Sequence, residues 1–319
     1  MVWKKLGLVF NPAEHQLPGA CVDFAQSPQA VMVGETIRIF FSTRERDEGG
    51  KYLSRVTYAN FDRSFTFLSM APSFVMDLGA AGCYDEHGIF PLNVLRVNDE
   101  LLGYIGGWSR RVAVPVDGSI GIARSKNEGV TFERIGPGPV LSSSINEPFL
   151  IGDPFVQRFD HLFHMWYIFG TQWLTVEDSS AVERVYKIGH AISNDGVRWE
   201  KPSEGVQIIQ DVLGPTESQA LPSVAAFAGK YHMVFCFRES IDFRHVPSRA
   251  YRLGYAFSTD LVNWTRDDSM LGLDVGENSW DSEMLCYPHL FQVGGKTYLL
   301  YNGNEFGRNG FGVAELVAP

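Results

Sequence analysis

The sequence predicts an all-β protein, a five-bladed β-propeller with four-stranded antiparallel blades. A proline opens an apolar run five times, at Pro28, Pro91, Pro154, Pro222 and Pro288, with spacings of 63, 63, 68 and 66 residues. A second strand-like pattern follows each of the first four runs. Glycine and proline number 32 and 16, which is typical of a turn-rich β protein, and no amphipathic helix stands out. A repeat of this length indicates one supersecondary unit stacked around a ring.

Each repeat begins with a hairpin. The second and third copies, "HGIFPLNVLRVNDELLGYIGGWSR" and "LIGDPFVQRFDHLFHMWYIFGTQW", read as a strand, a tight polar turn and a second strand rich in aromatic and β-branched residues. The block that follows, as in "GSIGIARSKNEGVTFERI" and "YKIGHAISNDGVRWEKP", adds a strand, a turn and a short aromatic strand. Its "NEG" and "NDG" turns favour hairpins. Four strands per repeat are therefore expected.

The repeats divide a single domain, 1–319, into successive blades. Their expected limits are approximately 21–72, 84–140, 147–210, 217–270 and 281–319. The last copy ends at "GFGVAELVAP" without an outer strand, and the N-terminal "WKKLGLVF" resembles the outer strands of other copies. We therefore expect residues 2–10 to complete the last blade and close the ring, which removes a free sheet edge. The alternative is a disordered N-terminal tail.

Composition narrows the partners and the setting. The formal net charge is −10. An acidic chain gains little binding free energy from releasing the counterions of nucleic-acid phosphates, so a nucleic-acid partner is not expected. The N-terminus lacks the pattern of a signal peptide, and no apolar run is long enough to span a membrane. The four cysteines are scattered and form no CxxC pair. A reduced, cytoplasmic setting is expected.

Two sets of polar residues are expected to meet at one end of the propeller axis. The first precedes the prolines: Asp153 stands one residue before its proline, and Asp23, Glu86, Glu217 and Glu283 stand five before theirs. Positions four apart share a strand face, because strand side chains alternate. Residues close to these acids are His87, Glu147 and His289. The second set ends the second strands: Arg44, Trp108, Arg110, Gln172, Arg238, Asn302 and Asn304.

This mixture of carboxylates, guanidinium groups, amides and tryptophan suits a sugar, whose hydroxyls need hydrogen bonds and whose ring has an apolar face. For any single residue a structural role is an equal alternative, because acids at strand ends also pair with arginines or cap backbone amides.

Three segments carry a resemblance to a known group. "CVDFAQSPQAV" at 21–31, "GDPFV" at 152–156 and "TESQALPSV" at 216–224 resemble the blade openings of five-bladed propeller glycosidases, the arabinanase, xylosidase, invertase and levansucrase group with its phosphorylase relatives. The resemblance implies catalytic carboxylates at Asp23, Asp153 and Glu217. Glu217 would be the general acid, Asp23 the base or nucleophile, and Asp153 the group that orients substrate and tunes its neighbour. Ser27 stands where that group has an aspartate.

The resemblance predicts a glycoside hydrolase-like enzyme acting through paired carboxylates. The strings "FSTRER", "HGIFPLN", "GWSR" and "YNGNEFG" are similar to glycosidase-like propeller proteins of bacterial surface-polysaccharide synthesis. A non-hydrolytic carbohydrate-binding propeller and a glycosyl transferase or phosphorylase stay open as alternatives. The expected ligand is a small molecule or oligosaccharide, and three arginines also suit an anionic one. No cofactor is required. A structural cation such as Ca²⁺ in the axial channel, with Glu283 or His289 as ligands, is the open alternative.

Overall fold

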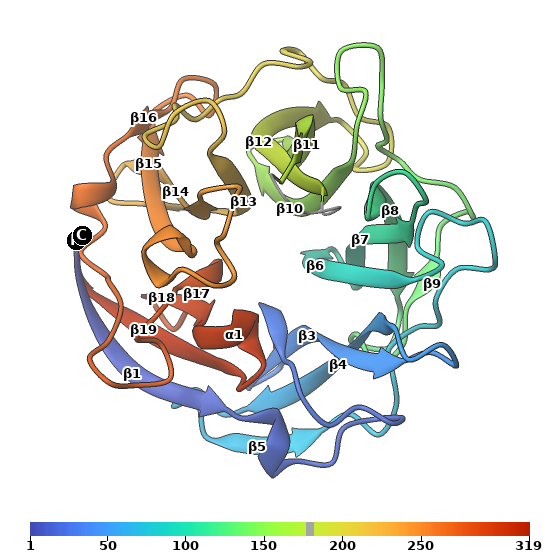
Figure 1. The fold of residues 1–319 in the computed structure, drawn as a ribbon. Coiled ribbons are helices and arrows are strands. Elements are labelled where there is room, and N and C mark those ends of the chain that lie inside the picture. Colours follow the sequence, from blue (N-terminus) through green and yellow to red (C-terminus); the bar gives the residue numbers. More distant parts are fainter. Residues whose placement is uncertain (177–181) are drawn as a thin grey trace.

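The computed structural model describes residues 1–176 and 182–319, and its strands form antiparallel sheets set around a central axis (Figure 1). The innermost strands contact one another in order, and the last contacts the first, so that they close a ring. These strands are β2 (Gln26–Val33), β6 (Gly88–Val97), β10 (Ile151–Phe159), β13 (Ser218–Phe227) and β17 (Cys286–Val293). Each contains one of the repeat prolines. The chain is nearly all β and propeller-like, as the repeats predicted.

Each inner strand pairs antiparallel with the strand that follows it, and the further strands of the set pair outward in turn. In the first two sets the outer strands are β3 (Thr36–Arg46), β4 (Tyr52–Phe61), β5 (Phe67–Met70), β7 (Glu100–Arg110), β8 (Val116–Ser125) and β9 (Glu133–Arg134). One parallel bridge, between Ser54 and Gly88, joins these two sets into a single sheet. In the third and fourth they are β11 (Leu162–Thr175), β12 (Val182–Ser193), β14 (Lys230–Arg238), β15 (Arg252–Ser258) and β16 (Thr265–Arg266).

The third set has three strands and a bridge in place of the fourth strand. Beyond β12, only the pair Ile192–Glu200 makes the antiparallel contact that a fourth strand would make. The hairpin between these two residues is tied instead by Ser193 and Asp195, whose side chains accept the backbone amides of the turn. The expectation of four full strands therefore fails at this position, although the chain still returns to the sheet there.

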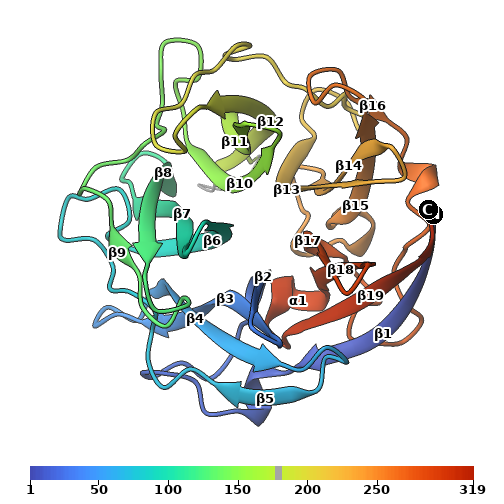
Figure 2. The same cartoon turned by 180° about the vertical axis from the view of Figure 1, so that it is seen from behind.

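The last set joins the two ends of the chain (Figure 2). Its order is β17, β18 (Lys296–Asn302), β19 (Phe311–Ala318) and β1 (Val2–Phe10). β1 pairs antiparallel with β19, with Leu8 opposite Gly312. Its residues alternate between exposed and half-buried, as expected for an outer strand with one face on the core. The prediction that residues 2–10 complete the C-terminal sheet is confirmed.

The remaining elements are short helices in the connections between strands: η1 (Pro12–Glu14), η2 (Pro247–Arg249), η3 (Asp268–Met270) and α1 (Asn304–Gly307). Within the described ranges, no helix has the length and apolarity needed to cross a bilayer.

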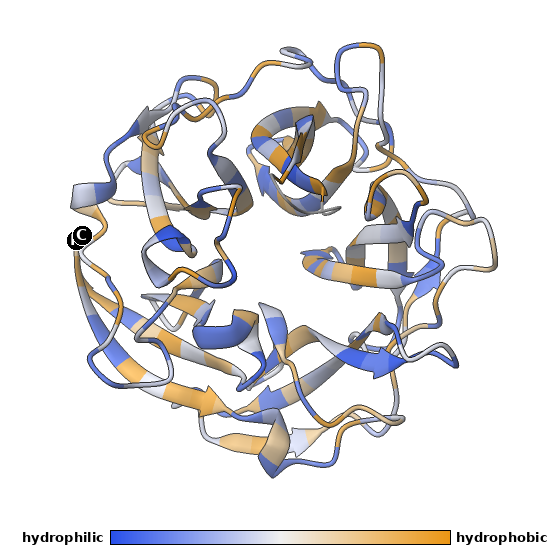
Figure 3. Cartoon of the chain, in the orientation of Figure 1, coloured by the Kyte–Doolittle hydropathy of each residue, from blue (hydrophilic) through white to orange (hydrophobic). Residues whose placement is uncertain are grey.

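The core lies between neighbouring sheets. Phe40 of β3 packs in one apolar cluster with Ile105 of β7, and Tyr104 of β7 packs in another with Phe163 of β11. Apolar and polar residues alternate along many strands, which gives each sheet faces that can bury apolar side chains (Figure 3). A fully buried side chain such as Trp166 contributes on the order of 2–3 kcal/mol to this packing.

A bulge at the repeat proline interrupts every inner strand. In β10 the register shifts between Gly152 and Phe155, and equivalent shifts occur in the other four. Proline has no N–H to give to the sheet, so the strand passes it with one unpaired stretch. The residue before the proline has a positive φ in four strands: Ser27 (52°), Asp153 (50°), Leu221 (47°) and Tyr287 (56°).

Because of the bulge, one prediction from the sequence is wrong, namely which residues share a strand face. The residues five positions before the prolines were expected to share a strand face with the pre-proline residues. They lie before the strands begin, since β2 starts at Gln26 and β17 at Cys286. The left-handed backbone before the proline also breaks the alternation on which the prediction relied. Asp153 and Glu217 therefore do not lie on equivalent faces.

Candidate functional site

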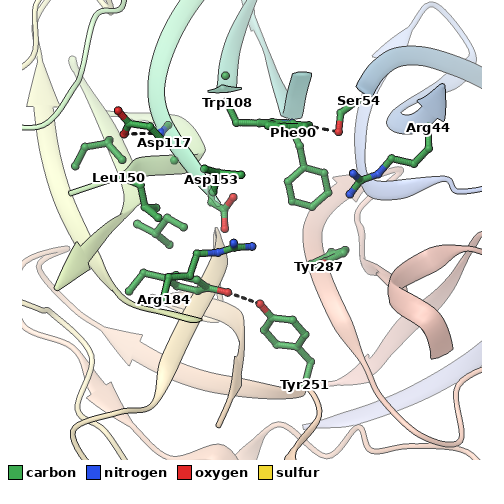
Figure 4. Close-up of a pocket in the computed structure, with 17 residues that line it drawn as sticks. Arg44, Ser54, Phe90, Trp108, Asp117, Leu150, Asp153, Arg184, Tyr251 and Tyr287 are labelled. Carbon is green, nitrogen blue, oxygen red and sulfur yellow. Dashed lines mark hydrogen bonds between the residues drawn. The ribbon is translucent and has the colours of Figure 1, made fainter. Parts of the chain in front are cut away.

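A cavity of about 230 Å³ opens on the axis at the N-terminal ends of the inner strands. Figure 4 shows its lining, which comes from several sheets. Three of its residues, Phe90, Asp153 and Tyr287, are pre-proline residues that the bulges direct inward. The other lining residues are Arg44, Ser54, Gly107, Trp108, Val116, Asp117, Gly118, Leu150, Ile151, Gly152, Ile168, Arg184, Tyr186 and Tyr251. We call this cavity the axial pocket.

Asp153 is the most buried carboxyl group of the axial pocket. Its residue is 8% exposed, and its side chain points into the cavity beside Arg184 (Figure 4). Burial raises the pKa of Asp153 to about 7, because desolvation of the carboxylate outweighs the stabilising amide of Leu221 and the charge of Arg184. Asp153 therefore exchanges a proton near neutral pH.

Two arginines face the pocket from different sheets. Arg44 comes from β3 and Arg184 from β12, and their guanidinium groups point toward the centre from opposite sides (Figure 4). Arg44 Nε donates a hydrogen bond to Gln26 Oε1 at 2.8 Å. Among the described residues, neither side chain makes an ion pair with a carboxylate. Burial lowers the pKa of Arg44, which still leaves it charged at neutral pH.

Aromatic residues form the wall between these groups. Tyr186 and Tyr251 share a hydrogen bond between hydroxyl oxygens 2.6 Å apart, and Arg238 Nη2 donates to Tyr186 Oη at 3.0 Å. Tyr287 packs edge to face with Phe90, with centroids 5.1 Å apart. Burial raises the pKa of Tyr251 and that of Tyr287, so both keep their phenolic protons. The wall offers ring faces and hydroxyl groups together.

The lining of the pocket includes a second carboxylate residue, Asp117. Asp117, on β8, accepts hydrogen bonds from Arg111 and from the amide of Gly118. Trp108, on β7, donates from its indole Nε1 to Ser54 Oγ at 3.2 Å, which fixes the ring at the cavity wall (Figure 4). A carboxyl that titrates near neutrality and a hydrogen-bonded carboxylate thus line one cavity.

A second cavity, of about 240 Å³, adjoins the axial pocket and shares Arg44, Arg184 and the three tyrosines with it. Its own residues include Phe24, Tyr52 and Phe306. Arg238 also lines it, although the residue is almost fully buried: its guanidinium stacks over Phe243 at 3.5 Å.

The sequence prediction is partly matched by this geometry. Asp153, Arg44 and Trp108 line the axial pocket, and Arg238 lines the adjoining cavity. His289 faces a separate cavity of about 420 Å³ at the opposite end of the axis. Burial lowers the pKa of His289 to about 4, which keeps it neutral.

Glu217 does not have the environment of a general acid. It is 0% exposed and does not line the axial pocket. Arg266 Nη1 lies 2.6 Å from its Oε1, and the amides of Val212 and Leu213 donate to its Oε2 at 2.8 and 2.9 Å. Gln219 Nε2 adds a further hydrogen bond at 3.0 Å. These donors engage both carboxylate oxygens of Glu217 inside the protein, away from the lining of the axial pocket.

Asp23 is also displaced from its predicted position. Its carboxylate lies 3.6 Å from Arg308 Nε at the rim, and it lines neither cavity. The strand that was expected to carry Asp23 inward begins three residues later, so Gln26 reaches the adjoining cavity instead. The structure therefore does not bring Asp23, Asp153 and Glu217 together in one cavity.

Several predicted ligand-binding residues make structural contacts in the second sheet. Glu86 accepts a hydrogen bond from the amide of Gly82 at 2.7 Å. The ring of His87 accepts the amide of Arg110 at 3.4 Å, while the Arg110 guanidinium pairs with Asp47 at 2.6 Å. These residues lie around the rim, outside the lining of the axial pocket.

Buried structural roles account for two more predicted residues. Glu147 accepts hydrogen bonds from Tyr167 Oη at 2.7 Å and from Lys201. Asn302 accepts the amide of Ser27 at 2.8 Å and donates to the carbonyl of Ala25 at 2.8 Å. Asn302, at the end of β18, thus connects the last sheet to the start of β2, where the ring closes.

The remaining predicted residues lie away from the axial pocket. Asn304 accepts the amide of Glu283 at 2.8 Å, and the Glu283 residue is exposed. Gln172, on β11, is half-buried and lines neither cavity. Within the described ranges, no cluster of three or more His, Cys, Asp or Glu side chains could hold a metal ion.

Sequence reasoning missed most of the lining of the axial pocket, and five of the missed residues show which signals were available. Phe90 and Tyr287 had a usable signal, because they occupy the same pre-proline position as Asp153. Arg184 and Tyr186 lie two apart on β12, in "VERVYKIGHA", and so share one strand face. Asp117 had no comparable signal, because it lies at the start of a third strand.

Comparison with known protein sequences finds two relatives that match almost the whole chain. No protein-family model matches the chain. Two uncharacterized proteins of Mycobacterium tuberculosis are similar to it, MT1551 of strain CDC 1551 / Oshkosh and Rv1502 of strain ATCC 25618 / H37Rv. Each is 33% identical over 324 residues, which covers 99% of this chain and 99% of the relative.

Solved structures with the same fold act on sugars. A glycoside hydrolase has a TM-score of 0.73 at 18% identity, covering 99% of this chain and 91% of its own. The β-1,2-mannobiose phosphorylase of Listeria innocua has a TM-score of 0.69 at 9% identity, covering 99% of this chain and 96% of its own. The Bombyx mori GH32 β-fructofuranosidase BmSUC1 has a TM-score of 0.65 at 15% identity, covering 97% of this chain and 63% of its own. The chain therefore shares the fold of these proteins.

Proposed function

We propose, from the premise that this chain belongs to one family with the Mycobacterium tuberculosis proteins Rv1502 and MT1551, that it binds and processes a glycoside in the axial pocket. The observation that carries the proposal is Asp153, a buried carboxyl with a pKa of about 7 at the centre of a polar and aromatic cavity. Groups whose pKa is shifted by burial in a cleft are typical of active sites.

In this proposal Asp153 takes the general acid's role that the sequence analysis gave to Glu217. A carboxyl with a pKa near neutrality can hold a proton at working pH and still release it to the oxygen of a leaving group. The bulge supports this role, because it places the carboxyl at the cavity surface while the flanking residues of β10, Ile151 and Phe155, stay buried.

Asp117 is the candidate for the second carboxylate. Its hydrogen bonds from Arg111 and Gly118 orient it at the wall of the same pocket. In glycoside hydrolysis the second carboxylate activates water or attacks the sugar directly. The pair Asp153 and Asp117 thus replaces the predicted pair of Glu217 and Asp23.

The other lining residues suit a sugar. Trp108 and Phe90 offer apolar surfaces on which a sugar ring can lie, and the hydroxyls of Tyr186, Tyr251 and Tyr287 can exchange hydrogen bonds with its hydroxyl groups. A small number of oriented polar groups among aromatic walls is typical of small-molecule sites.

The proposal treats the chain as one domain of five blades. In this proposal each inner strand with its outer strands forms one blade, with approximate limits at 21–72, 84–140, 147–210, 217–270, and 281–319 together with 2–10. A cytoplasmic location and a part in surface-polysaccharide synthesis stay predictions.

Turnover by wild-type protein and by Asp153→Asn tests the proposal. The purified protein is given a panel of p-nitrophenyl glycosides and oligosaccharides, with and without inorganic phosphate, and product release is measured. We expect Asp153→Asn to lower kcat/KM by about 100-fold or more, while the control Asp99→Asn, in an exposed hairpin turn, leaves it unchanged. Wild-type rates in Asp153→Asn would overturn the proposal. Sugar binding without turnover in the wild type would instead favour a carbohydrate-binding propeller.

A further inference from the structure

We propose that Arg44 and Arg184 form a clamp for an oxyanion, a phosphate or a carboxylate, carried into the axial pocket by its ligand. The inference rests on the proposed function, because the clamp belongs to the same pocket. It goes further by proposing that the ligand is negatively charged and that Arg44 and Arg184 bind the charged group.

The placement of the two guanidinium groups is the first support. Arg44 projects from the end of β3 and Arg184 from β12, and both line the axial pocket and the adjoining cavity. Figure 4 shows them pointing toward each other across the open space. Two cations that face one another repel, and burial makes the repulsion stronger. An anion bound between them would remove this cost.

The lack of internal partners is the second support. Among the described residues, the Arg44 side chain has one hydrogen-bond partner, the neutral Gln26, and it lies over the rings of Phe24 and Tyr52. In the part of the chain that the structure describes, the Arg184 side chain has no hydrogen-bond acceptor, and neither arginine has a carboxylate within 4.0 Å. A partly buried guanidinium normally has its donors satisfied, so donors that are not bound by any described residue are available to a ligand.

A third arginine of the same region shows the contrast. Arg238 is nearly fully buried, and its donors reach the carbonyl of Glu239 and the hydroxyl of Tyr186. Its plane stacks on Phe243. Arg238 therefore supports the wall of the pocket, whereas Arg44 and Arg184 can donate hydrogen bonds to a ligand in the pocket.

The charge of the pocket is the third support. Asp153 is the carboxyl that faces Arg184, and near neutral pH it is only partly ionised. The tyrosines of the wall are neutral and can donate O–H groups. The charge of Asp117, the other carboxylate of the lining, is offset by its pair with Arg111. Arg44 and Arg184 therefore give the pocket a positive excess within a chain whose net charge is −10. Guanidinium groups bind phosphate and carboxylate through two parallel hydrogen bonds, which gives such a clamp its geometry.

Isothermal titration calorimetry with three probes tests the clamp at about pH 6, where Asp153 is mainly protonated. The probes are inorganic phosphate, methyl β-D-glucuronide and the neutral methyl β-D-glucoside. We expect at least one anionic probe to bind about tenfold or more tighter than the neutral one, with an affinity that falls as KCl is added. Phosphate alone would identify a phosphate ligand, and the glucuronide alone a uronic acid.

Variants assign the effect to the clamp. Arg184→Gln and Arg44→Gln should each weaken the anionic probe by about tenfold or more, and Arg184→Lys should weaken it less, because it keeps the charge without the planar fork. The control Arg63→Gln, which alters an exposed pair with Glu35, should bind as the wild type does. Because Arg44 is hydrogen-bonded to a buried glutamine, Arg184→Gln decides the result if Arg44→Gln does not fold.

Two outcomes would overturn the clamp: anionic probes that bind no better than methyl β-D-glucoside, or an unchanged anion affinity in folded Arg184→Gln. Asp153→Asn separates this failure from that of the proposed function. It should abolish turnover and still bind the anion. Turnover retained in Asp153→Asn would contradict the proposed function and leave the clamp standing.

Discussion

Asp153 combines a strained backbone with a buried carboxyl group. Its φ of 50° lies in the left-handed region, which costs a residue with a side chain on the order of 1–3 kcal/mol. Burying the carboxyl adds a further cost that shows as the raised pKa. The surrounding sheets hold both in place. Two unfavourable terms at one residue are expected where function, rather than stability, determines the residue type.

The first prediction concerns stability and pH. The folded-state pKa of Asp153, about 7, lies above the ordinary value of 3.8. Between these values the folded protein holds a proton that the unfolded chain has released, so ionisation of Asp153 lowers the free energy of unfolding as pH rises toward 7. Asp153→Asn removes this loss. It should therefore become more stable relative to the wild type by a few kcal/mol between about pH 4 and pH 8.

Urea unfolding of both proteins at several pH values measures this difference. The comparison with the wild type matters, because burial also lowers the pKa of His190 and of His289 to about 4. Because of those histidines the free energy of unfolding falls as the pH falls, which is opposite to the effect of Asp153. They affect the wild type and the variant equally. A difference that does not vary with pH would contradict the buried, titrating Asp153.

The second prediction concerns Glu217. Glu217→Gln removes the charge opposite Arg266 in a fully buried pair, which should lower the free energy of unfolding by about 3–5 kcal/mol. The control Glu128→Gln alters a solvent-exposed pair with Arg96 and should cost about 1 kcal/mol or less. Urea unfolding checks both values. Full stability in Glu217→Gln, together with lost turnover, would restore the acid's role that the sequence suggested.

At the scale of the element, the proline bulge decides which side chain enters the pocket. The sequence predicts the inner strands and the special position of Asp153 because the prolines recur in a fixed pattern. It does not predict the interrupted alternation, so acids such as Glu217 and Asp23 are assigned to the wrong place. Arg184 and Tyr186 are found only when the third strand of a blade is known to begin at the same face.

The third prediction tests the contact between the two chain ends. Gly310 has a φ of 104°, and a Cβ there would lie 1.8 Å from the carbonyl oxygen of Phe10. Gly295 has a φ of 76° with open space around it. Gly295→Ala should therefore cost about 1 kcal/mol, from backbone strain alone. Gly310→Ala should cost clearly more, because β1 must shift. Equal losses in thermal unfolding would contradict the packing of Phe10 against β19.

At the scale of the whole molecule, β1 covers the outer strand of the last sheet. Phe10 is buried and packs with Phe41, Phe61 and Phe311, which come from both sides of the closure. The two chain ends therefore hold the ring together by hydrogen bonds and by a shared apolar cluster. The repeat pattern in the sequence contained this arrangement, because only the last copy lacked an outer strand.

The fourth prediction is that removal of residues 1–10 exposes β19 as a free edge. An unpaired edge strand with apolar surface favours association with other chains. The shortened protein should unfold at a lower temperature and should show a larger mass in solution than the full chain at equal concentration. Light scattering after size-exclusion chromatography measures the mass. An unchanged mass with an unchanged unfolding temperature would contradict the role of β1.

The central claim is that the bulge-borne Asp153 and the arginines Arg44 and Arg184 contact one ligand in the axial pocket. A crystal structure with the tightest-binding of the three sugar and phosphate probes tests it most directly. We predict electron density for the probe within hydrogen-bond distance of Asp153 and of at least one of these two arginines. Density for the probe at another position on the protein, with the axial pocket holding only water, would contradict the claim.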